Sequence, residues 1–514
     1  MYYTEDENQI SIEEFALPFG GMLNGSNRWV KLAGIMPWKH IEEIYAATMS
    51  QNTGRRAYSA RIAFGALYIK QQERLSDEDV VTAIQENPYM QYFLGQKEFM
   101  TEPLFDSSMM VHFRKRFPVE EIAKINEYIC TGKWPESIRN VDRNDGVEPE
   151  TADNADDDGD DSDNDHRPPA SSGSQKGKKN RNTSKKKEKR HKKNRGKLVM
   201  DATVAPADIK YPTDIDLLNQ SREHLETAID YLWEKVPHNG HKLPYSPKKA
   251  RKSYLKLAKS KKWTKAKCRA AIGEQLRCVE LASARLSRLQ EEYPEWQGLL
   301  PAWLRQRLGV IPDVYAQQKD MYDRNSNVCP DRICSLSQPH VRPIKRGKRP
   351  NPTEFGQKLH LSVVNGYTFF EQTSWNNFNE ALDLPAAVRD YKRKFGCWPE
   401  AVLADKIYQT RANKLFCKEN GIRLSGLPLG RRRASETDAK VRKQMYDDSC
   451  ERNIVESRNG IAKRRYGLDL IMSKLDETAK TEAALSILAM NAIHRIARWL
   501  ALCRSMIVIF PVFQ

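Results

Sequence analysis

Hydrophobic residues recur at helical spacing through residues 20–135. This period predicts helices over Trp38–Thr48, Tyr58–Gln72 and Met109–Phe117. Ser76 precedes three consecutive acids, a pattern typical of a helix N-terminus. The N-terminal part of the chain is therefore predicted to be all-α.

The last of these predicted helices carries the cations Arg114, Lys115 and Arg116. Short helices joined by tight turns and ending in a basic helix are typical of helix-turn-helix-like DNA-binding domains. Small helical bundles also serve many other purposes, so the pattern leaves that alternative open. We take residues 1–135 as a helical N-terminal DNA-binding domain and Arg114 and Lys115 as candidate DNA contacts.

After residue 198 the pattern changes to strands alternating with helices. Asn365-Gly366 gives a strong hairpin signal. The predicted strands are Leu198–Val204, Lys358–Val364, Tyr367–Thr373, Ala401–Ala404 and Ile422–Leu427, and the predicted helices are Asn377–Phe395, Thr410–Asn420 and 436–466. A helical insertion at about 214–345 follows the first strand. Without it, this is the order of a ribonuclease-H-like α/β mixed sheet, and we assign residues 198–514 to that fold.

Composition separates these two regions. Residues 141–166 hold 12 Asp and Glu, residues 167–197 hold 14 Lys and Arg, and neither half has enough apolar residues to build a core. We therefore predict a disordered, acidic-then-basic linker over 136–197, between the all-α and α/β parts. Its charges nearly cancel, so the chain's excess of positive charge belongs to the folded regions.

The whole chain has 84 Lys and Arg against 67 Asp and Glu, a net charge of +17. Such a surplus indicates a polyanionic partner, although a basic protein without one is the alternative. The stretch Pro247–Lys267 interleaves many cations with Tyr254 and Trp263, a mixture suited to phosphate contacts and base stacking. A solvated helix face explains that stretch equally well.

Other classes of protein fit this sequence poorly. The nine cysteines are scattered without zinc-type spacing. Residues Met1–Gln9 are acidic and polar, unlike a signal peptide. The apolar stretch Ala483–Phe513 is interrupted by charged residues, which favours a buried helix over a membrane span. We expect a cytoplasmic protein of the bacterial cytoplasm or nucleoid, with no membrane partner.

Three acids are candidates for metal binding. Asp201 ends the apolar run Leu198–Met200, and Asp405 ends the run Ala401–Ala404. A carboxylate at the end of a buried strand is costly unless it is paired or bound to a cation. Together with Glu456 on the long predicted helix, these acids could hold a pair of Mg²⁺ or Mn²⁺ ions. This is the apparatus of phosphoryl transfer on nucleic acid.

The geometry of the predicted helix supports Glu456 as the third metal ligand. Arg452 lies about 40° from it around the helix and Lys463 about 20°, whereas the rival ligand Glu451 points about 140° away. One face thus presents a carboxylate between two cations that could hold phosphates. The cations Arg431, Arg432 and Arg433 precede this helix and are further candidates for DNA contact. A surface ion-pair ladder is the alternative for this helix considered alone.

Several segments, in order, resemble the DDE class of insertion-sequence transposases. They are Asp201–Thr203, Asp208–Asp214, Val341–Lys348, Glu354–Lys358, Ala404–Tyr408, Arg452–Glu456, Lys463 and Tyr466–Leu468. The chain looks most similar to the insertion-sequence-five-like group, and residues 20–120 resemble its InsH-type N-terminal domain.

The resemblance implies a metal-dependent transposase that binds the terminal inverted repeats of an insertion sequence. Such an enzyme cuts the ends of the element and joins the freed 3′ ends to target DNA, and it assembles as a homo-oligomer on double-stranded DNA. By position, Asp201, Asp405 and Glu456 match the metal-binding DDE triad, and Arg452 and Lys463 match the basic signature residues. Asp208 is a competing first ligand, more suited to ordering the turn after the strand.

One position departs from the family. Ser449 stands where the signature has a tyrosine, and Tyr446 lies a turn earlier. Two other functions remain open: a ribonuclease-H-like nuclease with the same core, and a DNA-binding protein whose active site has decayed.

Overall fold

A computed structural model describes residues 2, 10–18, 20–50, 56–135, 193–235, 247–345, 353–426 and 439–509. Most of the linker predicted over 136–197, and the whole of Arg431–Arg433, lie outside these residues. Residues 1–135 and 194–514 form one compact unit.

The N-terminal region is all-α, as predicted. Its helices are α1 (Arg28–Ile35), α2 (Trp38–Ala47), α3 (Ala60–Glu73), α4 (Asp77–Glu86), α5 (Pro88–Phe93), α6 (Met109–Arg116) and α7 (Val119–Thr131). The Ser76 hydroxyl accepts a hydrogen bond from the Asp79 amide at 3.0 Å, which confirms the predicted cap of α4. Trp29, Phe64 and Phe93 are fully or almost fully buried and form the centre of its aromatic core.

A mixed sheet follows. Its strands are β1 (Lys197–Pro206), β2 (Arg342–Lys345), β3 (Thr353–Val364), β4 (Tyr367–Ser374), β5 (Ala401–Leu403) and β6 (Arg423–Leu424). The order is β2-β3-β1-β5-β6, with β4 also paired to β3. Strands β1 and β3 are antiparallel, whereas β1, β5 and β6 are parallel. This is the predicted ribonuclease-H-like arrangement.

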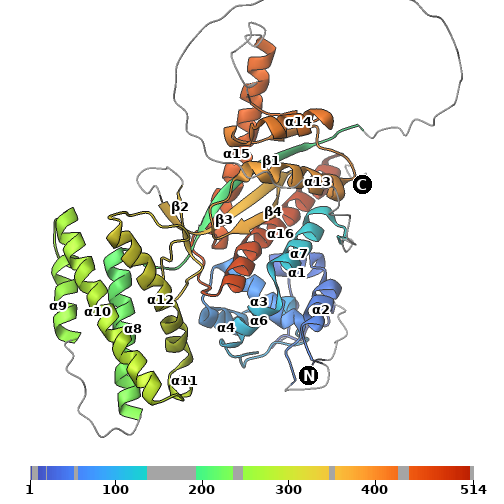
Figure 1. The fold of residues 1–514 in the computed structure, drawn as a ribbon. Coiled ribbons are helices and arrows are strands. Elements are labelled where there is room, and N and C mark those ends of the chain that lie inside the picture. The colour runs from blue at the N-terminus through green and yellow to red at the C-terminus, as the bar shows by residue number, and fades with distance from the viewer. Residues whose placement is uncertain are drawn as a thin grey trace, which may run out of the picture. The chain divides into compact units, whose positions relative to one another are not determined.

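Helices cover both faces of the sheet (Figure 1). They are η1 (Glu380–Asp383), α13 (Leu384–Phe395), η2 (Lys406–Tyr408), α14 (Arg411–Glu419), α15 (Ala439–Tyr466) and α16 (Asp476–Ile509). Leu198 and Met200 of β1 pack toward α13 and α14. Val199 and Ala205 face the other way, toward α15 and α16. The two-residue period of β1 therefore serves two separate cores.

The turn between β3 and β4 confirms the predicted hairpin. Asn365 and Gly366 have φ of 52° and 82°, the left-handed pair that a two-residue type I′ turn requires. Val364 and Tyr367 pair directly across it.

Three predicted boundaries change. The helix expected from Asn377 is divided into η1 and α13, because Pro385 stands at the first turn of α13, where proline needs no amide partner. The strand expected over Ile422–Leu427 has only the two residues of β6. The expected helical insertion ends in β2, which pairs with the beginning of β3.

The insertion has its own core. It contains α8 (Asp214–Lys235), α9 (Pro247–Ala258), α10 (Lys265–Glu292), α11 (Trp296–Leu299) and α12 (Ala302–Asp323). Leu218, Val279 and Val314, from three different helices, are completely buried there.

The N-terminal helices share their core with α16 (Figure 1). Asn491 of α16 donates to the Asn126 side chain at 2.8 Å and to the Thr368 carbonyl, and accepts from the Thr368 amide at 3.0 Å. These contacts join α7, α16 and β4 around one buried amide. None of the helices within the described ranges has the length and apolar character needed to cross a membrane.

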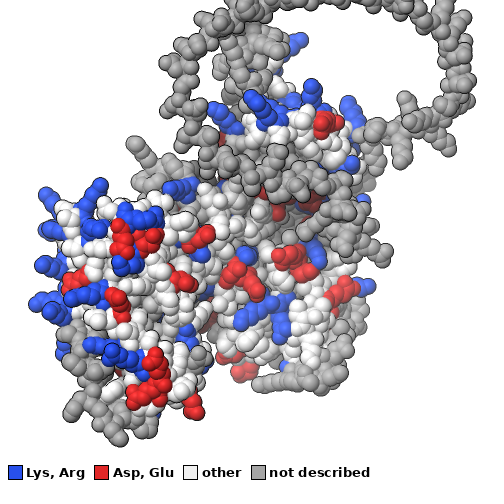
Figure 2. Space-filling model, viewed as in Figure 1, with Lys and Arg blue, Asp and Glu red and all other residues white. Residues whose placement is uncertain are grey.

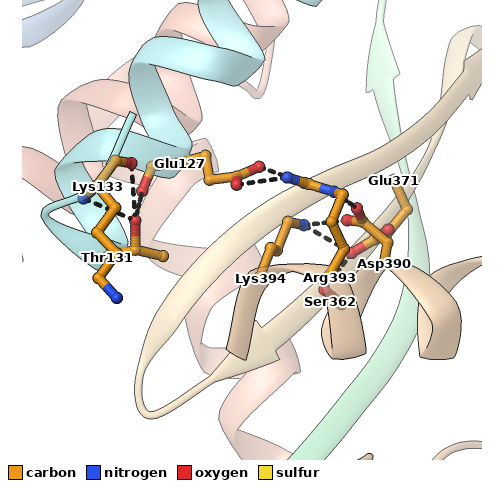
Figure 3. Close-up of polar contacts among 8 residues, drawn as sticks. All are labelled: Glu127, Thr131, Lys133, Ser362, Glu371, Asp390, Arg393 and Lys394. Atoms are coloured by element: carbon orange, nitrogen blue, oxygen red, sulfur yellow. Dashed lines mark hydrogen bonds and ion pairs between the residues drawn. The ribbon is translucent and has the colours of Figure 1, made fainter. Parts of the chain in front are cut away.

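A second set of polar contacts joins α7 to α13 (Figure 3). Glu127 accepts two hydrogen bonds from the guanidinium of Arg393, at 2.8 Å and 2.5 Å. Next to this pair, the buried ammonium of Lys394 contacts Asp390 and lies 3.9 Å from Glu371. The Glu127–Arg393 ion pair thus holds the all-α part against the α/β core, and the contacts of Lys394 join α13 to β4 within that core.

Candidate active site

The strand register brings Asp201 and Asp405 to the same level of the sheet. Parallel pairing of β1 with β5 runs from Lys197↔Ala401 to Val199↔Leu403. Two residues further along each strand are Asp201 and Asp405, and Asp405 still has extended backbone, with φ −71° and ψ 171°. Continuing the register therefore makes the two aspartates neighbours, on the face that α15 covers.

Asp201 lies in the middle of a strand. The description of Asp201 as a strand-end carboxylate is wrong, whereas the predicted strand Leu198–Val204 is confirmed: β1 continues to Pro206 and pairs Asp201 with Leu361 of β3. Asp405, in contrast, follows the last residue of β5 and begins η2, where its carboxylate accepts from the Lys406 amide at 2.8 Å. The candidate active site therefore lies at the level of the sheet where β5 ends and β1 continues.

Helix α15 brings Glu456 to this end of β5. Val455 is buried in a small cluster with Val199, Val363, Ala401 and Leu403. One turn before Glu456, the guanidinium of Arg452 lies 3.4 Å from the Asp405 carboxylate. Glu456 is exposed, beside the buried face of α15 and in the turn that covers Val199. Its backbone is therefore next to that of Val455, whose side chain packs on β1, β3 and β5.

Glu451 has a different partner. Its carboxylate lies 2.5 Å from the ammonium of Lys197, at the start of β1. Asp208 is also engaged elsewhere: its amide donates to the Ile471 carbonyl, and its own carbonyl accepts from Gln338 at 2.8 Å. Both residues thus contact neighbouring segments, Glu451 through its carboxylate and Asp208 through its backbone.

The carboxylates do not converge on one point in this structure. Across the described ranges, no group of three or more His, Cys, Asp or Glu side chains could hold a metal ion. Asp405 instead contacts Arg452 and the Lys406 amide. The donor types suit a hard divalent cation, since all are carboxylate oxygens, and the strand register brings the backbones of Asp201 and Asp405 to one level of the sheet. Metal binding by the three acids stays a prediction.

The predicted DNA contacts have different environments. Lys463 is partly buried on α15, seven residues after Glu456, and Lys115 is exposed on α6. Arg114 does not fit the prediction: it is 7% exposed and donates two hydrogen bonds to the Asp77 carboxylate. Because the Arg114 side chain is buried beneath α3 and α4, its role is structural. Tyr446, the doubtful substitute for the signature tyrosine, is 71% exposed.

Sequence reasoning missed a buried polar network on the opposite face of the sheet. The Tyr408 hydroxyl lies 2.9 Å from His360 Nε2 and donates to Glu380 at 3.3 Å. Lys358 lies 2.8 Å from Glu380, and Asp383 lies 3.1 Å from His360 Nδ1. Burial raises the pKa of Tyr408 well above its usual range, and the charges of Glu380 and Asp201 raise that pKa further.

This network anchors η2, the turn that begins at Asp405. Tyr408 is fully buried three residues after Asp405, so its contacts hold that turn against the sheet. The available signal was the alternation of Lys358, His360 and Ser362 with aliphatic residues along β3. Glu380 and Asp383 of η1 contact the polar side of β3.

Comparisons with known proteins agree with this fold. Residues 402–492 match the family described as "Transposase DDE domain", and residues 19–116 match "Transposase domain (DUF772)". The first match spans β5, α15 and the Asp405 and Glu456 positions, and the second spans α1 to α6.

One curated relative is "Uncharacterized protein ORF8 in nfe locus" from Rhizobium meliloti, 35% identical over 135 residues. The alignment covers 25% of this chain and 65% of the relative, so the chain spans less than two thirds of that protein. No solved structure matches the chain significantly. Two transposase family models thus match separate parts of the chain, and together with the ribonuclease-H-like sheet they are consistent with a DDE insertion-sequence transposase.

Proposed function

We propose that this chain binds the terminal inverted repeats of an insertion sequence, cleaves DNA at those ends and joins the 3′ ends to target DNA. The observation that carries the proposal is the parallel register that aligns Asp201 with Asp405, next to the turn of α15 that bears Glu456. Carboxylates on two adjacent strands and a covering helix are suited to phosphoryl transfer with divalent ions. The family matches make DNA the substrate to test first.

Asp201, Asp405 and Glu456 would together hold Mg²⁺ or Mn²⁺. Bound there, the ions would activate water or a 3′-hydroxyl and stabilise the leaving oxygen. The side chain of Asp405 turns from Arg452 to take this role, and the freed guanidinium is then available to a phosphate. Lys463, on the same face of α15, supplies a second cation along the bound strand.

The wider setting follows from the same resemblance. We place the chain in the insertion-sequence-five-like group, acting in the bacterial cytoplasm or nucleoid. Its partners are double-stranded inverted-repeat and target DNA, and further copies of itself assembled on that DNA. Lys115 on α6 and Arg431–Arg433 before α15 are proposed DNA contacts outside the acidic triad.

The test compares variants that remove one carboxylate charge with little change in shape: Asp201→Asn, Asp405→Asn and Glu456→Gln. Each should lower the rate of cleavage of end DNA in Mg²⁺ by at least about 100-fold, because each loses a ligand for the ions that stabilise transition-state charge. Binding to the same DNA, measured by fluorescence anisotropy, should change by less than about threefold. Asp208→Asn is the matched control and should cleave normally.

Each outcome decides between functions. Cleavage retained by Asp405→Asn would remove that residue from the site. Mg²⁺-dependent cleavage without joining of labelled 3′ ends to target DNA would make the protein a nuclease. DNA binding without nicking by the unmodified protein would indicate a decayed active site.

A further inference from the structure

The helices α9 and α10 begin with a long run of exposed cations. Between Pro247 and Gly273 the sequence has no acid at all. The exposed cations are Lys248, Lys249, Arg251, Lys252, Lys256, Lys259, Lys261, Lys262, Lys265 and Lys267, a set called here the α9–α10 cationic surface. Lys and Arg gather on the outer side of these helices, at the left of the view (Figure 2). The α9–α10 cationic surface is distant in sequence from the three acids of the proposed metal site.

These cations have no acidic partner among the residues that the structure describes. Elsewhere in the insertion, acids pair with other cations, such as Asp320 with Arg324 and Asp323 with Lys319. Lys248, Lys252 and Lys256 follow one another at four-residue spacing on α9, where like charges destabilise a helix by roughly 0.2–0.5 kcal/mol per pair. Repulsion of this kind, uncompensated within the insertion, indicates an anionic partner from outside it.

The cations stand on a well-anchored helix. Ala250 and Leu257 of α9 are buried, and the Ala250 carbonyl accepts from Gln275 of α10 at 3.1 Å. The Tyr254 hydroxyl donates to Asp216 of α8, which lowers the pKa of that carboxyl against the opposing effect of burial. The cationic face is therefore held in a fixed position relative to α8, and is not a loose tail.

A groove of about 750 Å³ lies between the α9–α10 region and strands β2 and β3. Leu257, Trp263 and Ile272 contribute to its α9–α10 side, and Arg342 and Lys345 of β2 contribute to the other. Gly356, which pairs with Arg342, is five residues along β3 from Leu361, the partner of Asp201. At about 3.4 Å per residue that separation is roughly 17 Å, the length of about five base pairs of duplex.

The chemistry of the surface favours a nucleic-acid backbone over a protein. Trp263, 47% exposed, is the one large apolar side chain exposed in the fully described stretch from Pro247 to Lys267. Protein interfaces place an apolar core inside a polar rim, whereas interfaces with DNA are polar and strongly positive. A cationic surface that lacks an apolar centre is therefore better suited to contact with DNA phosphates than with another protein.

We propose that the α9–α10 cationic surface binds the sugar-phosphate backbone of duplex DNA without regard to sequence. This inference rests on the proposed function, since it supplies a second point of attachment for DNA that enters the site at Asp201. It places that attachment on the insertion, separate from the N-terminal helices. The DNA lies along α9 and passes the groove toward the edge formed by β2 and β3.

The test uses the full chain with three substitutions on one face of α9: Lys249→Gln, Lys252→Gln and Lys256→Gln. The control carries Arg411→Gln, Lys418→Gln and Lys474→Gln, which remove the same charge from exposed sites outside the insertion. Affinity for a duplex of unrelated sequence is measured by anisotropy at several salt concentrations. Thermal melting by circular dichroism checks that both variants are folded.

The α9 variant should bind at least about tenfold more weakly at low salt than the control. Its plot of log affinity against log salt should be shallower by up to about 2.7, since each phosphate contact contributes about 0.9 to the slope. The loss should be equal for duplexes with and without the inverted repeat. An α9 variant that keeps the affinity and slope of the control would overturn the proposal, as would an equal loss in both variants.

These readouts are separate from the triad. Binding that depends on α9 would stand even if no cleavage were observed, and cleavage that depends on Asp201 would stand even if the α9 variant bound normally. The two proposals can therefore fail independently.

Discussion

His494 of α16 lies beside the turn between β3 and β4, in surroundings that favour its neutral form. Burial lowers the pKa of its imidazole, and the nearby charges of Arg458 and Arg498 lower it further, to about 4. The ring also packs edge-on against Tyr367, with centroids 4.9 Å apart. This histidine therefore joins α16 to the hairpin, and Arg458 of α15 donates to the Gly366 carbonyl of the same hairpin.

The pH dependence of stability follows from this pKa. Between pH 6.5 and about 4 the unfolded chain takes up a proton on His494 that the folded chain does not, so the free energy of unfolding falls as pH falls through that window. The contribution is at most about 3 kcal/mol, at 1.36 kcal/mol per pKa unit, and partial exposure reduces it. His494→Gln should flatten urea-unfolding stability over this range. An unchanged pH profile would contradict the assignment.

At the scale of elements, α4 and α6 are joined by Asp77 and Arg114. Burial would raise the pKa of Asp77, but hydrogen bonds from Arg114 and Lys70 outweigh it and lower this pKa to about 2. The side chain of Arg114 is 8% exposed, so removal of its partner would leave a buried guanidinium without a carboxylate.

We expect Asp77→Ala to lower the free energy of unfolding by roughly 3–5 kcal/mol, the cost of an unpaired buried charge. Adding Arg114→Met should restore part of that loss, because the second change removes the stranded charge. Chemical denaturation at pH 7 measures both variants. If the double variant were less stable than Asp77→Ala, the pair would not explain the effect.

At the scale of the molecule, α16 completes the core of the N-terminal helices. Thr481 of α16 donates to the Phe117 carbonyl at 2.8 Å, and Gln71 of α3 donates to Ser486 of α16 at 2.8 Å. Ala483, Leu488 and Ala492 of α16 are fully buried in the same cluster as the N-terminal aromatic residues. The apolar faces of α3 and α7 therefore have no complete cover within residues 1–135.

A fragment of residues 1–135 should not unfold cooperatively. Without α16 it exposes the apolar surface on which α3 and α7 pack, so it should bind a hydrophobic dye and show no sharp thermal transition. The full chain, measured in the same way by circular dichroism and dye fluorescence, is the control. A sharp two-state transition of the fragment would show that these helices fold as an independent domain.

Much of the fold was predictable because its signals are local. The turn at Asn365-Gly366, the cap at Ser76 and the period of α15 each depend on residues a few positions apart. The short strands β2 and β6 were missed or misjudged, because a strand of two to four residues has too few positions to show alternation. Their existence depends on partners distant in sequence.

The candidate site divides in the same way. Asp405 and the spacing of Arg452, Glu456 and Lys463 were apparent from the sequence. The end of an apolar run and the residues that share a helix face can both be recognised from a few neighbouring positions. The burial of Arg114 and the contacts of Tyr408 were not apparent. Each depends on which elements pack over a strand or helix. The spacing of hydrophobic residues within one segment does not reveal which other segments pack on it.

By itself, then, the sequence determined the helices, the hairpin, the basic charge and the acids worth testing, because neighbouring residues encode period, caps and turns. That Asp405 shares the level of Asp201, and that α16 joins the N-terminal helices to the sheet, became apparent from the tertiary structure alone. The physical reason is that register and burial are set by contacts between segments far apart in the chain, and such contacts leave no local pattern.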